Sequence, residues 1–126
     1  MKVLLVFAGG GAGAVARYLT GVAALKTLGP GWPYGTFAVN AIGGLAMGLL
    51  AGVLALKGGA DQERWRVLLG VGVLGGFTTF SAFSLETALM IERRDWLQAL
   101  GYVGASVVTA IAALFLGLIL ARRMFA

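Results

Sequence analysis

Apolar residues along this chain form four long runs, which short polar segments separate. The runs cover about residues 3–25, 34–56, 67–91 and 96–121. Each run is close to the roughly 20 residues that an α-helix needs to cross the hydrocarbon core of a bilayer. The pattern therefore predicts an all-α membrane protein with four transmembrane helices, which form one domain over residues 1–126.

The third run differs in its centre from a helix that only faces lipid. Residues 70–86 combine glycines, hydroxyl groups, phenyl rings and one carboxylate. Each glycine weakens a helix by about 0.5–1 kcal/mol relative to alanine. Non-helical backbone at membrane depth persists only where it is buried in protein or lines a watered path. The pattern predicts a broken third helix that exposes backbone groups and ring edges to an ion.

Composition supports a membrane location. Hydrophobic residues make up 60% of the chain and the mean hydropathy is +0.92, whereas soluble proteins average about 45–50% apolar residues. The chain has no cysteine and no histidine, so it lacks thiol chemistry, the commonest metal ligand and the usual proton carrier at neutral pH. The net charge is +5, but the basic residues lie at the ends of the runs. There they indicate anchors to lipid headgroups and no nucleic-acid partner.

The basic residues also bear on topology. Four spans place both chain ends on one side of the membrane, and two groups of basic residues result: Lys2, Lys57, Arg64, Arg66, Arg122 and Arg123 on that side, and Lys26, Arg93 and Arg94 on the other. This bias is small for the positive-inside rule, so either the termini are cytoplasmic or the chain inserts in both orientations. Four helices alone enclose little hydrophilic space. Glycine and alanine faces permit close helix approach, so we expect a dimer.

Phe80 and Phe83 are three residues apart, so on a helix they share a face. Pairs of this kind usually pack in a core or face lipid. Here hydroxyl side chains, which an apolar packing surface does not require, are interleaved with the rings: Thr78, Thr79, Ser81 and Ser84. Because the edge of an aromatic ring is positive, these rings can face an anion while their apolar bodies exclude larger, more hydrated competitors.

Two polar side chains in the first half of the chain each have two interpretations. Arg17 lies near the inner end of the first run, where it either reaches the interface or attracts anions at the mouth of a vestibule. Asn40 lies well inside the second run. Its amide either donates to an anion or bonds to a neighbouring helix.

Polar residues of the third and fourth runs leave a similar choice. Glu86 is a carboxylate at membrane depth or near the interface, which makes it a functional candidate, with a proton-coupled cation site as the competing interpretation. Tyr102 and Ser106 are four residues apart on one helix face, and Thr109 is on the adjacent face. Their hydroxyls either donate to a polar track or bond between helices.

Two other classes of function are excluded. The glycine-rich residues 9–13 invite a nucleotide-binding interpretation, but no lysine follows and no βαβ context exists, so small residues for tight helix packing explain them better. The chain contains no pattern for a nucleophile and base, a metal set or a carboxylate dyad. We therefore expect no enzyme.

Three segments of the chain resemble motifs of one known family. Residues 75–86, with the sequence GGFTTFSAFSLE, closely resemble the third-helix motif of the Fluc (CrcB) fluoride channels. Residues 10–18 and 35–44 are similar to the first- and second-helix motifs of that family. The resemblance covers all four spans in order.

The resemblance implies a dual-topology homodimer of two antiparallel chains in the inner (plasma) membrane of a prokaryote. It would export fluoride from the cytoplasm passively through two pores. The matching pore residues are Phe80, Phe83 and Asn40, with Arg17 near the vestibule. The polar track would add Tyr102 and Ser106, which match the fourth helix of the family. We expect Ser81, Glu86 and Thr109 to supply further polar groups to this track.

The resemblance also implies a structural Na⁺ at the centre of the dimer, held by the backbone carbonyls of Gly75 and Thr78. Two residues depart from the family pattern. Ala82 stands where threonine is frequent, and Ala110 stands at a step where serine is expected. One or two hydroxyls of the polar track are therefore missing.

The alternative from another class is a small proton-coupled multidrug or cation antiporter, which is also a four-helix, dual-topology protein. Such a protein needs a titratable carboxylate at the centre of the bundle, typically early in the chain. The first two runs contain none, and Glu86 comes late in the third. A purely structural membrane subunit explains neither the hydroxyl-rich break nor the paired rings.

Overall fold

The computed structural model describes all 126 residues, which fold into helices without any β-strand. In chain order the elements are α1 (Lys2–Leu28), α2 (Tyr34–Lys57), η1 (Gly59–Asp61), α3 (Gln62–Trp65), η2 (Arg66–Leu74), α4 (Gly75–Phe77), α5 (Phe80–Glu92) and α6 (Trp96–Phe125). Four segments are long and apolar enough to cross a membrane: α1, α2, the stretch Gly59–Glu92, and α6. This confirms the predicted helical class and the number of spans.

The helices continue past the predicted runs at their polar ends. α1 reaches Leu28, where the prediction stopped at residue 25, and it ends at Gly29, whose φ is 82°. α6 reaches Phe125, where the prediction stopped at residue 121. Lys26 and Arg122 lie in the last turns of these helices, where a positive charge interacts favourably with the free carbonyls. Charged residues therefore end the apolar run without ending the helix.

The third span is not one continuous α-helix. α3 leads into η2, which is a π-helix of nine residues, and then into the short α4. At Thr78 and Thr79 the backbone is extended, with φ/ψ of −83°/159° and −149°/116°. The Thr79 hydroxyl accepts a hydrogen bond from the Ala82 N–H at 3.1 Å. Thr79 is therefore the N-cap of α5, and the extended segment separates α4 from α5.

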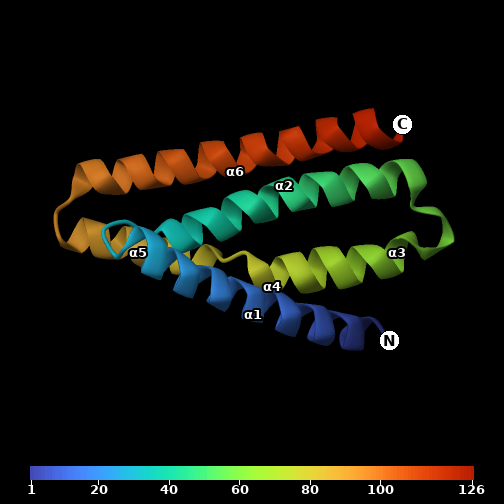
Figure 1. Cartoon of the computed structure of the whole chain (residues 1–126), viewed down its shortest axis with the longest axis horizontal. Coiled ribbons are helices and arrows are strands. Elements are labelled where there is room, and N and C mark those ends of the chain that lie inside the picture. The colour runs from blue at the N-terminus through green and yellow to red at the C-terminus, as the bar shows by residue number, and fades with distance from the viewer.

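The helices pack closely wherever they present glycine to each other. α1 packs against η2 and α4, and α2 lies along α6 (Figure 1). A Cβ atom on Gly13 of α1 would collide with the Val73 carbonyl and lie 2.8 Å from the Phe77 nitrogen. A Cβ atom on Gly48 of α2 would collide with the Leu114 carbonyl of α6. Backbones meet directly at both places, as small residues permit in membrane proteins.

The two ends of the molecule carry different connections. Both termini lie at the same end as the connection from α2 to α3, and the α1–α2 and α5–α6 connections lie at the other end (Figure 1). Only 16 of the 126 residues are buried, and large apolar side chains cover the outer faces of the helices. Phe7, for example, is 80% exposed. A surface of this kind suits hydrocarbon better than water.

Candidate functional site

The extended segment between α4 and α5 is held by one amide side chain of α2. Asn40 Nδ2 donates to the Thr79 carbonyl at 3.0 Å, and the Thr79 N–H donates to Asn40 Oδ1 at 2.8 Å. Both backbone groups of Thr79, which a break leaves without helical partners, are thereby satisfied. One of the two N–H groups on Asn40 Nδ2 makes this bond, and the other is free to donate elsewhere.

Arg17 holds the other side of the break. Its Nε donates to the Gly76 carbonyl at 3.1 Å, which ties α1 to α4. Arg17 also lines a cavity of about 300 Å³ together with Thr36 and Thr79. None of the three ion pairs in the structure includes it, so its charge has no carboxylate partner. The side chain lies half-buried between the helices and is bonded to protein.

The break also diverts two backbone donors. In an α-helix the carbonyl of each residue accepts from the N–H four residues later. The Thr79 N–H, which would serve Gly75, donates to Asn40 instead. The Ala82 N–H, which would serve Thr78, donates to the Thr79 hydroxyl. The carbonyls of Gly75 and Thr78 have therefore lost their usual helical donors.

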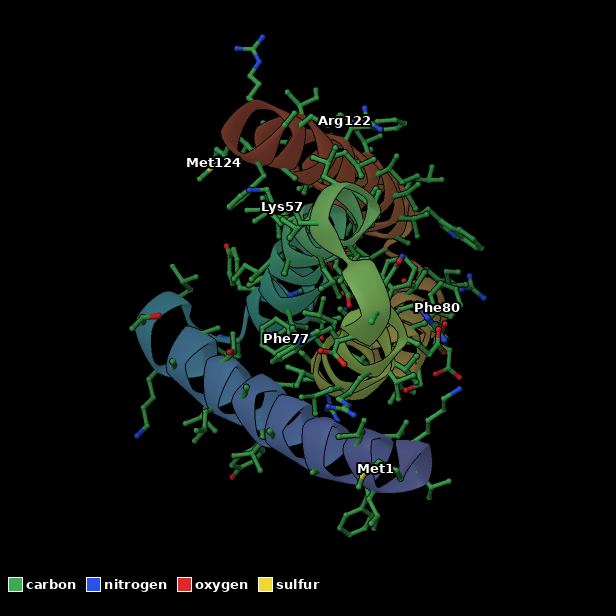
Figure 2. The ribbon with its side chains drawn as sticks, turned by 90° about the vertical axis from the view of Figure 1, so that its right-hand side faces the viewer. Met1, Lys57, Phe77, Phe80, Arg122 and Met124 are labelled. Carbon is green, nitrogen blue, oxygen red and sulfur yellow. The ribbon has the colours of Figure 1, made fainter.

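A groove of about 410 Å³ follows the break along one side of the chain. Residues of α2, α4, α5 and α6 line it, among them Asn40, Gly75, Thr78, Phe80, Phe83 and Ser106. The ring centroids of Phe80 and Phe83 are 5.6 Å apart. Phe83 is buried, whereas Phe80 is 78% exposed and points away from the bundle, unlike Phe77 (Figure 2). In a single chain the groove is therefore open on the side of Phe80.

Ser106 supplies an unusual polar group to this groove. The residue is buried, and its Oγ is the one buried side-chain polar atom that has no hydrogen-bond partner. Buried hydroxyls are nearly always bonded, since an unsatisfied one costs about 1–3 kcal/mol. A free hydroxyl donor therefore lies in the same groove as the two phenyl rings.

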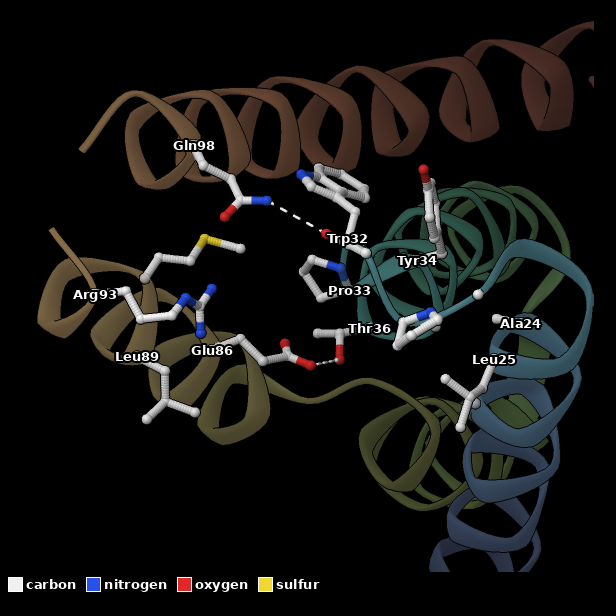
Figure 3. Close-up of a pocket in the computed structure, with 16 residues that line it drawn as sticks. Ala24, Leu25, Trp32, Pro33, Tyr34, Thr36, Glu86, Leu89, Arg93 and Gln98 are labelled. Atoms are coloured by element: carbon white, nitrogen blue, oxygen red, sulfur yellow. Dashed lines mark hydrogen bonds between the residues drawn. The ribbon is translucent and has the colours of Figure 1, made fainter. Parts of the chain in front are cut away.

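Glu86 lies beside the groove in a network of hydroxyl groups. Its Oε2 accepts from the Thr36 hydroxyl and its Oε1 from the Tyr102 hydroxyl, each at 2.9 Å. Tyr102 is fully buried, and its ring centroid lies 5.1 Å from that of Phe83. Tyr102 thus connects the carboxylate to the phenyl pair. Figure 3 shows Glu86 and Thr36 facing a second cavity, of about 380 Å³, at the end of the molecule.

Five of the predicted site residues do not line the groove: Arg17, Ser81, Glu86, Tyr102 and Thr109. Arg17, Glu86 and Tyr102 make the contacts described above, and Ser81 and Thr109 remain. Ser81 is exposed at the start of α5, and its Oγ lies 3.3 Å from the Thr79 hydroxyl. Thr109 is half-buried on α6. The structure therefore gathers Asn40, Phe83 and Ser106 in one groove and leaves these two hydroxyls outside it.

The structure adds two residues that the sequence analysis left out of the site. Thr79 presents its backbone to Asn40, and Thr36 donates to Glu86. Thr36 precedes Asn40 by four residues, so both side chains lie on one face of α2. That spacing could have indicated Thr36 as a site residue from the sequence.

These features define a class: a multi-pass membrane protein whose polar groups gather at a break in one of its helices. The model of the family described as CrcB-like protein, Camphor Resistance (CrcB), matches residues 4–118. The chain is therefore a member of the CrcB family, as the sequence motifs had predicted.

Individual relatives agree with this assignment over their whole length. The chain is 72% identical to the fluoride-specific ion channel FluC of Phenylobacterium zucineum (strain HLK1), over 98% of each chain. It is 68% identical to the protein of the same name from Caulobacter sp. (strain K31), over 98% of this chain and 97% of the relative. It is 52% identical to that of Mesorhizobium japonicum, over 98% of each. These relatives are bacterial and are named as ion channels, which are not enzymes.

Proposed function

We propose that this protein is a fluoride-selective channel in the inner membrane of a bacterium, through which F⁻ leaves the cytoplasm passively. The relatives that match its full length are named fluoride-specific ion channels, which supports this function. A membrane potential that is negative inside expels an anion, and it supplies about 2.3 kcal/mol per charge per 100 mV. No coupling to another ion is needed for export.

The main structural support for this proposal is the groove that contains Phe80, Phe83 and the free Ser106 hydroxyl. Fluoride is a small acceptor, so a free O–H and the second N–H of Asn40 suit it. The phenyl rings add positive edges and exclude larger hydrated anions. Tyr102 and Glu86 continue the track from Phe83, and Ser81 and Thr109 are added to it as polar candidates from their positions in the sequence.

A second copy of the chain, inserted antiparallel, would complete the groove. One chain leaves Phe80 and Gly75 exposed at membrane depth. An antiparallel partner would cover this face and, by symmetry, form a second pore with its own groove. The small bias in basic residues is compatible with insertion in both orientations.

A structural Na⁺ at the centre of such a dimer fits the donor set at the break. The carbonyls of Gly75 and Thr78 lack their usual helical donors, and hard cations prefer oxygen ligands. No cluster of carboxylates or histidines offers a different metal site. Two carbonyls from each chain would hold the ion and join the two breaks.

Replacement of either phenyl ring tests the function. We expect Phe80→Ile and Phe83→Ile to abolish fluoride efflux from liposomes, because isoleucine fills similar space without a positive ring edge. Efflux is followed with a fluoride electrode under an imposed F⁻ gradient. Phe115→Ile is the matched control, since Phe115 is an exposed ring on α6 that does not line the groove.

The same liposome assay distinguishes a fluoride channel from a proton-coupled antiporter. A channel releases fluoride much faster than chloride and needs no pH gradient, whereas an antiporter moves a cation only against protons. Wild-type efflux in both phenylalanine variants, in protein that is still dimeric, contradicts the role of the rings. Absence of fluoride efflux from the wild-type protein contradicts the function itself.

A further inference from the structure

The cavity of about 380 Å³ at the α1–α2 end contains an arginine that the channel function does not yet use. The cavity lies between the α1–α2 connection and α5. Of its lining residues only Glu86 and Arg93 carry a charge. Arg93 is the C-cap residue of α5 and follows Glu86 by seven residues, or two helical turns, so the two residues lie on the same side of that helix.

Glu86 poses an electrostatic problem for an anion path. Each of its oxygens accepts a hydroxyl bond, from Thr36 and from Tyr102. Without another charge in the cavity, a carboxylate would repel fluoride at the mouth. Arg93 lies on the same side of the cavity as Glu86 (Figure 3).

Arg93 is free to act on an ion in the cavity. The structure contains three ion pairs, and all of them involve Asp61 or Glu63 at the opposite end of the molecule. The side chain of Arg93 is exposed and makes no hydrogen bond within the chain. A guanidinium without a carboxylate partner is a strong attractor for small anions.

The cavity also continues toward the helix break. It shares four lining residues with the cavity of about 300 Å³ that contains Arg17 and Thr79: Gly21, Leu25, Gly35 and Thr36. Shared walls place the two cavities next to each other. An anion held near Arg93 is thus one cavity away from Arg17 and from the extended segment.

We propose that Arg93 collects fluoride at the mouth of this cavity and offsets the charge of Glu86, so that the anion enters toward Arg17. The inference rests on the fluoride channel function proposed above. It assigns Arg93 to substrate entry, upstream of the phenyl pair. Its effect is electrostatic and therefore decreases as salt screens the charge.

Arg94 provides a matched control in the next position. It carries the same charge, is exposed and belongs to the same turn, but it does not line the cavity. An arginine that acts only as an anchor to lipid headgroups would behave the same at either position. A larger effect of charge on the fluoride current at position 93 than at position 94 would therefore be due to the position of Arg93 in the cavity.

The absence of cysteine from the chain permits a sharp experiment. Arg93→Cys and Arg94→Cys are each reconstituted in planar bilayers and modified from both sides with a methanethiosulfonate reagent that carries an ammonium or a sulfonate group. The charge thus changes in a channel that has already folded. Fluoride current is measured at about 0.01 M and about 1 M ionic strength, where the Debye length is about 30 Å and about 3 Å.

For Arg93→Cys at low ionic strength we expect about two- to fivefold more current with the ammonium than with the sulfonate group. At high ionic strength the ratio should approach one. For Arg94→Cys the ratio should be smaller at low ionic strength, because the charge lies outside the cavity, and near one at high ionic strength. Equal ratios at the two positions, or a ratio that salt does not change, overturn the inference. Loss of current in the unmodified wild-type protein would instead contradict the channel function.

Discussion

Among single residues, Asn40 makes two hydrogen bonds to the backbone of the broken helix with its one amide group. It gives Thr79 both a donor and an acceptor, as a neighbouring strand would in a β-ladder. The sequence left open whether this amide donates to an anion or bonds to a helix. In the structure it bonds to the backbone of the third span, and one N–H remains for an ion.

We expect Asn40→Asp to destabilise the protein by about 1–3 kcal/mol, since a carboxylate oxygen would face the Thr79 carbonyl where an N–H now donates. Thermal unfolding in detergent measures the loss, and fluoride efflux should decrease with it. Gln98→Glu is the matched control, because the Gln98 amide donates to the Gly31 carbonyl at the surface over 3.4 Å. Equal unfolding temperatures for the two variants would show that the Thr79 bonds are dispensable.

Residue patterns predicted some of the site and missed the rest for physical reasons. The shared face of Phe80 and Phe83 follows from helical spacing. The bond between Thr36 and Glu86 joins residues 50 positions apart, so only the tertiary arrangement of α2 and α5 reveals it. Thr79 bonds to Asn40 through its backbone, and a backbone contact leaves no mark in the residue type.

The close packing of α1 against η2 requires glycine at the points of contact. Gly13→Ala should destabilise the protein by about 1–3 kcal/mol, because the methyl group would collide with the backbone of η2 at Val73. Gly11→Ala is the matched control two residues earlier, since a Cβ atom there meets nothing within 4 Å. Its helix propensity should leave the unfolding temperature unchanged or higher.

The comparison is made by thermal unfolding of both variants in the same detergent. If Gly13→Ala unfolds at the wild-type temperature, the close approach of α1 and η2 does not contribute to stability. Because the proposed fluoride groove lies on another face, Gly11→Ala should keep wild-type efflux.

The hydrophobic pattern predicted where the helices lie but did not predict the helix type. Apolar runs located all four spans, but they did not predict that Arg66–Leu74 forms a π-helix. An apolar run has the same composition in either helix type. η2 touches α1 through glycine backbone, and such a contact leaves no hydrophobic period that would reveal the helix type.

The molecule as a whole has two ends of different charge. The end with both termini holds six of the basic side chains, and the end with the α1–α2 connection holds Lys26, Arg93 and Arg94. Apolar side chains cover the helices between the two ends. Basic residues at both ends allow either end to face the cytoplasm.

Single cysteines on the two ends test the proposed dual topology. We expect Gly31→Cys and Ala60→Cys each to be labelled to about one half by a membrane-impermeant thiol reagent on intact cells, since a small charge bias lets both orientations insert. The two residues lie in exposed connections at opposite ends. Full labelling of one and none of the other would establish a single orientation and contradict the antiparallel dimer.

The groups that hold the helix break share one further property. The Asn40 amide and the Thr79 hydroxyl neither gain nor lose a proton under conditions in which proteins function. Acid unfolds many proteins because it protonates carboxylates that are paired in the native state. No carboxylate bonds to the segment Thr78–Thr79, so acidification of the cytoplasm finds no group to protonate there. The hydrogen bonds of this segment therefore do not depend on whether a carboxylate is protonated.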